Sequence, residues 1–180
     1  MFFMTKISHL SIPEVLLIEP EIFFDERGFF FESYNQNVFK NLSGYDINFV
    51  QDNHSLSKKG SLRGLHLQHD PYAQSKLIRV IEGEIFDVAV DLRENSKTFC
   101  TWVSLVLSSS NKKQLFIPKG FAHGFLALSE TAEVLYKTDK YYNKEAEIVY
   151  NWNDPKFNIS WPSLDVEYSF SAKDKIAPYI

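Results

Sequence analysis

The sequence predicts a mainly β protein, a double-sheet sandwich or jelly roll with short helices at its edges. Short apolar segments recur along the chain, and turn-forming residues separate them. Aromatic residues make up 16% of the chain, a content that favours strands. Helical periodicity is confined to two short stretches, which argues against a doubly wound α/β protein.

The most regular part of this pattern begins at residue 77. The run LIRVIEGEIFDVAVDL predicts two strands separated by a turn at Glu82-Gly83. Alternate apolar residues of the second strand share one face: Phe86, Val88, Val90 and Leu92. Four further strands are expected in WVSLVL, QLFI, GFLAL and EVLYKT, with SSSNKK, PKG and SET as the turns between them.

Two segments carry helix signals. The first is NQNVFKNL, which begins at Asn35. The second is SAKDKIAP near the end of the chain, where Ser171 and Asp174 fit an S-x-x-D capping box. Taken alone, Asp174 is therefore interpreted as a helix-capping residue.

Length and composition predict one domain over residues 1–180, without internal repeats or a linker. The single cysteine, Cys100, has no internal disulfide partner, which favours a reducing cytoplasmic setting. The apolar run in MFFMTKISHL is too short for a secretory signal or a membrane span, so no membrane association is expected. The net charge of −4 and the dispersed basic residues argue against nucleic-acid binding.

Several common catalytic motifs are missing from the sequence. Neither G-x-G-x-x-G nor G-x-x-x-x-G-K-[ST] occurs, so any phosphate must be held by side chains. The absence of G-x-S-x-G and C-x-x-C leaves acyl transfer and thiol redox chemistry without support.

Polar residues at strand positions are the remaining functional signal: Gln51, Asp52, Asn53, His54, Arg63, His66, Lys76, His123 and Tyr136. Each has a structural interpretation when taken singly, as a surface residue, a hydrogen-bonded core residue or a strand end. Together, the base His66, the cation Lys76 and the phenol Tyr136 fit proton abstraction next to a carbonyl.

A metal site is the main competing interpretation of the same residues. Its ligands would be His66, His69 and His123 with Glu82 or Glu84. Because His66 and His69 are three residues apart, they point to opposite faces of a strand. We therefore expect no metal.

Several segments, in order, carry a family resemblance: ERGFFFESYN, FVQDNHS, LRGLHLQ, KLIRVIEGEIFDVAVDLR, PKGFAHGF, EVLYKTDKYY and SAKDKIAP. Over about residues 16 to 178 the chain resembles the dTDP-4-dehydrorhamnose 3,5-epimerase family. The resemblance implies a cupin-type double-stranded β-helix, a homodimer, and activity without metal or organic cofactor. It also implies a dTDP-linked 4-keto-6-deoxy sugar as the substrate, in dTDP-L-rhamnose biosynthesis for surface polysaccharides.

The resemblance also implies roles for individual residues. His66 matches the catalytic base, Asp174 the carboxylate that pairs with it, and Tyr136 the acid on the opposite face of the sugar. Lys76 and Arg63 match cations beside the C4 oxygen and the phosphates, with His123 nearby.

Further substrate-binding positions implied by the resemblance are Arg27, Glu32, Gln51, Asp52, Asn53, Glu147 and Lys173. The first strands, with Arg27 and Glu32, are expected to reach the site of a partner subunit. Two alternatives stay open: a nucleotide-sugar 3-epimerase or ketoisomerase serving another deoxysugar, and a non-catalytic cupin sugar-binding module. The binding module is disfavoured because it has no need for a base, a phenol and a pairing carboxylate together.

Overall fold

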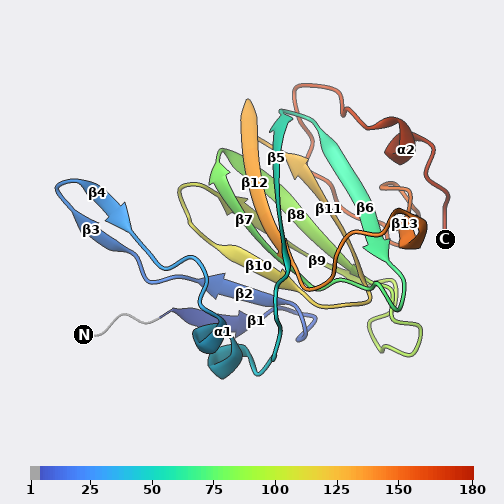
Figure 1. Cartoon of the computed structure of the whole chain (residues 1–180). Coiled ribbons are helices and arrows are strands. Elements are labelled where there is room, and N and C mark those ends of the chain that lie inside the picture. The colour runs from blue at the N-terminus through green and yellow to red at the C-terminus, as the bar shows by residue number, and fades with distance from the viewer. Residues whose placement is uncertain (1–4) are drawn as a thin grey trace.

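The computed structural model describes residues 5–180 as two antiparallel β-sheets packed face to face (Figure 1). This confirms the predicted cupin-type jelly roll. The first residues of the segment considered for a signal, 1–4, lie outside the described residues. Within residues 5–180, no helix has the length and apolar character needed to cross a membrane.

The six-stranded sheet has the order β1-β2-β10-β7-β12-β5. Its strands are β1 (Lys6–His9), β2 (Leu16–Glu19), β10 (Gln114–Ile117), β7 (Lys76–Glu82), β12 (Thr131–Thr138) and β5 (Gln51–Lys58). The five-stranded sheet has the order β13-β6-β11-β8-β9. Its strands are β13 (Glu147–Val149), β6 (Leu62–Gln68), β11 (Phe121–Ala127), β8 (Glu84–Asp91) and β9 (Trp102–Ser108).

The main core lies between these sheets. Ile78 and Val80 of β7 pack there with Ile85 and Ala89 of β8. The predicted apolar face of β8 is confirmed, and it lies on the side of β8 that points away from the main core. Phe86, Val88, Val90 and Leu92 belong to a separate cluster with aromatic residues of the C-terminal segment, including Phe157. Both faces of β8 are therefore covered.

The predicted turn at Glu82-Gly83 is present, and it carries the chain from one sheet to the other. β7 and β8 do not pair with each other, because they belong to different sheets. Gly83 has a φ of 74°, and a Cβ there would lie 2.0 Å from the carbonyl oxygen of Thr131. This crossing therefore requires glycine.

Helix α1 (Gln36–Ser43) begins where the sequence predicts it. The Asn35 side chain accepts hydrogen bonds from the backbone N–H groups of Asn37 and Val38, and so caps the first turn. Phe39 is buried against Phe116 on the outer face of the six-stranded sheet. A 3₁₀ turn (Lys144–Ala146) and helix α2 (Ala172–Lys175) are the remaining helical segments of residues 5–180.

A two-stranded arm, β3 (Phe23–Asp25) and β4 (Gly28–Phe30), extends away from the sandwich (Figure 1). Phe24 and Phe30 are its most exposed apolar side chains, at 75% and 70%. The arm packs few of its side chains against the rest of this chain, which leaves an apolar surface uncovered.

Candidate active site

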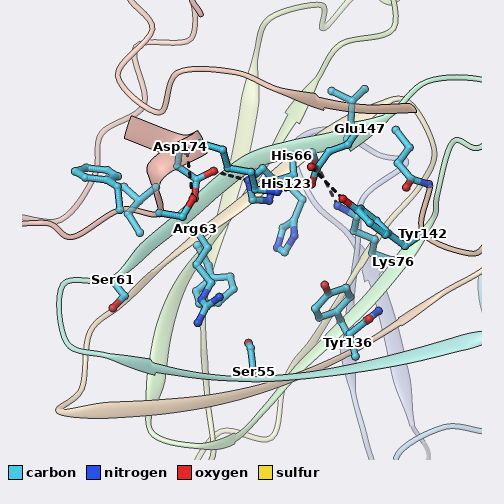
Figure 2. Close-up of a pocket in the computed structure, with 18 of the residues that line it drawn as sticks. Ser55, Ser61, Arg63, His66, Lys76, His123, Tyr136, Tyr142, Glu147 and Asp174 are labelled. Carbon is cyan, nitrogen blue, oxygen red and sulfur yellow. Dashed lines mark hydrogen bonds and ion pairs between the residues drawn. The ribbon is translucent and has the colours of Figure 1, made fainter. Parts of the chain in front are cut away.

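A pocket of about 620 Å³ opens between the two sheets. β5, β7 and β12 of the six-stranded sheet line one wall, and β6, β11 and β13 line the other. Residues 169–174, which include the start of α2, close one side (Figure 2). The pocket thus collects polar side chains from segments that lie far apart in the sequence.

His66 and Asp174 form a hydrogen-bonded pair in this pocket. The Nε2 atom of His66 lies 2.6 Å from Oδ1 of Asp174, whose residue is only 2% exposed. Burial raises the pKa of the Asp174 carboxyl, but the hydrogen bonds from His66 and Ser171 and nearby positive charge outweigh it, so the pKa is lowered overall. Asp174 is thus held as a carboxylate, and Nδ1 is the His66 nitrogen left to accept a proton.

The capping interpretation of Asp174 is confirmed in part. The Ser171 side chain accepts a hydrogen bond from the Asp174 backbone N–H, as a capping box requires. The Asp174 carboxylate, however, binds His66 and the Ser171 hydroxyl. Asp174 therefore belongs both to the first turn of α2 and to the pocket.

A second histidine–aspartate pair lies beside the first. His123 on β11 faces His66 on β6 as its cross-strand partner, and its Nε2 atom lies 2.5 Å from Oδ1 of Asp87. Asp87 is completely buried. Burial lowers the pKa of His123, which favours the neutral imidazole, although the Asp87 charge opposes the shift.

Lys76 supplies a buried cation next to these pairs. It is 7% exposed, and its Nζ atom donates a hydrogen bond to the backbone oxygen of His66 at 3.2 Å. Burial lowers its pKa to about 8, while the charges of Asp87 and Glu147 oppose the shift. Lys76 is therefore mostly protonated at neutral pH, and it holds its charge in a poorly solvated place.

Tyr136 lies on the opposite wall from His66 (Figure 2). Burial raises the pKa of its phenol, and the positive charges of Arg63 and Lys173 oppose the shift. Tyr136 is thus protonated at neutral pH and can donate a proton. Arg63 donates from Nε to Ser57 Oγ and from Nη2 to the Leu56 oxygen, which fixes its guanidinium at the pocket edge.

At the other edge, Lys173 and Glu147 form an ion pair with an Nζ to Oε1 distance of 2.6 Å. The Tyr142 hydroxyl donates to the second oxygen of the same carboxylate at 3.3 Å. The pocket therefore offers a histidine–aspartate pair that can act as a base, a buried cation, a phenol and charged side chains at its rim.

Comparison with known proteins agrees with this arrangement. The family model of dTDP-4-dehydrorhamnose 3,5-epimerase matches residues 9–180. The dTDP-4-dehydrorhamnose 3,5-epimerase of Salmonella typhimurium is 55% identical over 170 residues, which cover 94% of this chain and 92% of that protein. This chain belongs to the dTDP-4-dehydrorhamnose 3,5-epimerase family. It is an isomerase.

Solved structures of related epimerases have the same fold. The dTDP-6-deoxy-D-glucose-3,5-epimerase of Legionella pneumophila, in complex with dTDP-4-keto-L-rhamnose, superposes with a TM-score of 0.94 at 47% identity, covering 97% of this chain and 92% of that one. A 3'-monoepimerase from Streptomyces bikiniensis, in complex with dTDP-quinovose, has a TM-score of 0.90 at 31% identity, covering 96% and 86%.

The structure brings most of the residues implied by the family resemblance to this pocket. Its lining includes Asn53, Arg63, His66, Lys76, His123, Tyr136, Glu147, Lys173 and Asp174. Gln51 lies just behind the lining, where its Nε2 atom donates to Asn53 Oδ1 and its Oε1 atom accepts from the Tyr142 N–H.

Three proposed substrate-binding residues lie outside this pocket. Asp52 follows Gln51 on β5 and so points to the opposite face of the sheet, where it pairs with Lys137 at 2.8 Å. Arg27 lies at the tip of the arm, paired with Asp25, and Glu32 follows the arm. Neither Arg27 nor Glu32 lines the pocket of its own chain.

The side chains considered as ligands in the competing metal interpretation do not come together. His69 follows the end of β6 and bonds to the Asp70 carbonyl oxygen instead of facing the pocket. Among residues 5–180, no three histidine, cysteine, aspartate or glutamate side chains are placed to hold a metal ion.

Sequence reasoning missed several residues of this pocket. They include Ser55, Gln68, Tyr142 and Ser171 in the lining and Asp87 behind His123. Strand alternation could have found three of them. Ser55 shares a face with Asn53, and Gln68 shares a face with His66. Asp87 shares the core-facing side of β8 with Ala89. Tyr142 and Ser171 lie outside strands, where no periodicity predicts which way a side chain points.

Proposed function

We propose that this epimerase converts dTDP-4-dehydro-6-deoxy-D-glucose into dTDP-4-dehydro-L-rhamnose by inverting C3 and C5, as a step of dTDP-L-rhamnose biosynthesis. The observation that carries the proposal is the pocket itself. A hydrogen-bonded pair of the partly exposed His66 and the buried Asp174 faces Tyr136 across the space, with the cation Lys76 between the sheets. These are the groups that proton abstraction next to a ketone requires.

The first step is removal of a proton from carbon. The C4 ketone acidifies the hydrogens at C3 and C5, and Nδ1 of His66 takes one of them. The carboxylate of Asp174, bonded to Nε2, stabilises the imidazolium that forms. The electron pair of the broken C–H bond moves onto the C4 oxygen and gives an enolate.

Lys76 supplies the positive charge that stabilises this enolate, and His123 lines the pocket nearby. A protonated Lys76 in a poorly solvated pocket interacts strongly with a developing oxyanion. Tyr136 then gives its proton to the same carbon from the opposite face, which inverts that centre. Proton exchange with solvent restores His66 and Tyr136 before the second carbon reacts.

The rim of the pocket fits the nucleotide part of the substrate. Arg63 supplies a fixed cation for the diphosphate, and Lys173, Glu147, Asn53 and Gln51 supply polar groups nearby. The resemblance adds Asp52, although it faces away from this pocket. We propose that no metal and no organic cofactor takes part.

We further propose a cytoplasmic homodimer of single cupin-like domains spanning residues 1–180. The support is the uncovered apolar surface of the arm, with Phe24 and Phe30. An arm that packs on a second copy would carry Arg27 and Glu32 toward the pocket of that copy.

The test is the identity of the product. Purified protein and dTDP-4-dehydro-6-deoxy-D-glucose are followed by NMR, with C3 and C5 resolved. Inversion at both carbons is the expected result. Inversion at C3 alone supports the 3-epimerase alternative, in line with the Streptomyces bikiniensis neighbour. No inversion at either carbon refutes epimerase activity on this substrate.

A further inference from the structure

Ser171 lies between the start of α2 and the pocket, and both functions of its hydroxyl involve Asp174. The hydroxyl oxygen accepts the backbone N–H of Asp174 at 3.2 Å. The hydroxyl hydrogen is donated to Oδ2 of the Asp174 carboxylate at 2.8 Å. A serine has one hydroxyl hydrogen, so this donor is fully used by the carboxylate.

Within the described part of the chain, each oxygen of the Asp174 carboxylate has one side-chain donor. Oδ1 accepts from His66 and Oδ2 accepts from Ser171. Asp174 is 2% exposed, so water is a poor substitute for either donor. Two donors on opposite oxygens fix the plane of the carboxylate. Without the second donor, the carboxylate can turn away from the His66 ring.

We propose that Ser171 is a positioning residue, which holds the Asp174 carboxylate ionised and oriented so that His66 presents Nδ1 to the substrate. The inference rests on the proposed role of His66 as the base. It extends the pair to a chain of three residues, His66, Asp174 and Ser171, in which His66 is the residue that takes the proton from the substrate.

The charged surroundings of Asp174 come from two elements. His66 on β6 and Lys173 on α2 lower its pKa together with the Ser171 hydrogen bond, against the effect of burial. Loss of the Ser171 donor therefore raises the pKa of the carboxyl. The acid limb of the kcat/KM profile should then move to higher pH, because the pair loses its active protonation state earlier on acidification.

The experiment separates this role from ordinary helix capping. As an N-cap, aspartate equals serine and glycine costs only a few tenths of a kcal/mol, so a capping role predicts active S171D and S171G variants. A capping role thus makes S171D at least as active as S171G, whereas a donor role makes both variants less active than the wild type and S171D the less active of the two. S171G removes the donor, and S171D places a second carboxylate beside Asp174.

We expect S171G to lose roughly 10-fold in kcat, the scale of one hydrogen bond to a charged group, with KM nearly unchanged. S171D should lose more, and S171T should recover most of the activity lost in S171G because it keeps a hydroxyl. Thermal unfolding checks that each variant is folded. N35G weakens the cap of α1, far from the pocket, and is the matched control for cap loss alone.

The proposal is overturned if S171G and S171D keep wild-type kcat and an unmoved acid limb while H66N is inactive. A different result, in which H66N itself keeps wild-type turnover, refutes the role of His66 as the base. The two failures are therefore distinguishable.

Discussion

At the scale of single residues, the site depends on titratable groups held away from water. The hydrogen-bonding partner of His66, Asp174, lies 108 residues away in the sequence. The sequence could predict the residue types, because a histidine, a lysine and a tyrosine at strand positions suggest acid–base chemistry. It could not predict which nitrogen of His66 is free, since that depends on the position of Asp174.

Replacement of His66 by asparagine should remove the base and leave a side chain that can still hydrogen-bond. General-base catalysis typically contributes ~10²–10⁴ in rate, so kcat should fall by that factor. Binding of dTDP, measured by calorimetry, should persist because its proposed contacts are other residues. Turnover within a few-fold of the wild type would mean that His66 is structural.

Replacement of Asp87 by asparagine should change the pH dependence of the reaction. The variant keeps an acceptor for His123 but removes the buried charge that raises the pKa of Lys76. Lys76 is charged below its pKa of about 8 and neutral above it, so stabilisation of the oxyanion is lost as pH rises. In D87N this decline should begin at lower pH and approach roughly 100-fold where Lys76 is neutral.

The pH profile of kcat measures this effect directly. E133Q, which changes a carboxylate on the outer face of β12, serves as the control. A basic limb that stays in place in D87N would contradict the electrostatic link between Asp87 and Lys76.

At the scale of elements, strand alternation predicted much and failed at identifiable places. It located the strands from residue 77 onward and the shared face of Val88 and Val90. It did not indicate that β7 and β8 belong to different sheets, because pairing is a long-range property. Applied to β5, the same alternation would have separated Asp52 from Gln51 and Asn53.

The arm of β3 and β4 was not predicted as a separate element, although its residues were assigned a role at a partner's site. Its strands are three residues long, too short for a clear period. Its apolar side chains face outward. The usual inference that apolar residues of a strand pack into the core of their own chain is therefore wrong for this arm.

The arm leads to a prediction about assembly. Exchange of Phe24 and Phe30 for serine removes the two most exposed apolar side chains of the hairpin. We expect the double variant to be monomeric by light scattering and to bind the substrate more weakly, because Arg27 and Glu32 no longer reach a second pocket. I176S, at an exposed isoleucine of the C-terminal segment, should stay dimeric. A double variant that remains a fully active dimer would contradict this assignment of the arm.

At the scale of the whole molecule, the jelly roll brings two sheets together so that their polar strand residues meet in one pocket. In the proposed mechanism Lys76 meets the charge on the enolate, and no cluster of metal-ligating side chains forms among residues 5–180. We therefore expect the purified protein to work at full rate after exhaustive chelation. Activity that disappears with EDTA and returns with a divalent ion would support the metal interpretation instead.

The central claim is that His66 and Tyr136 act on opposite faces of the sugar, and Tyr136→Phe tests it most directly. The variant keeps the ring and its packing but lacks the proton donor. His66 can still remove a proton, exchange it with solvent and return one to the same face. Substrate in D₂O, followed by NMR at C3 and C5, should therefore still gain deuterium. The variant should lose inversion far more strongly than it loses this exchange. Equal losses of exchange and inversion would contradict the account and leave Tyr136 as a residue that packs or orients the substrate.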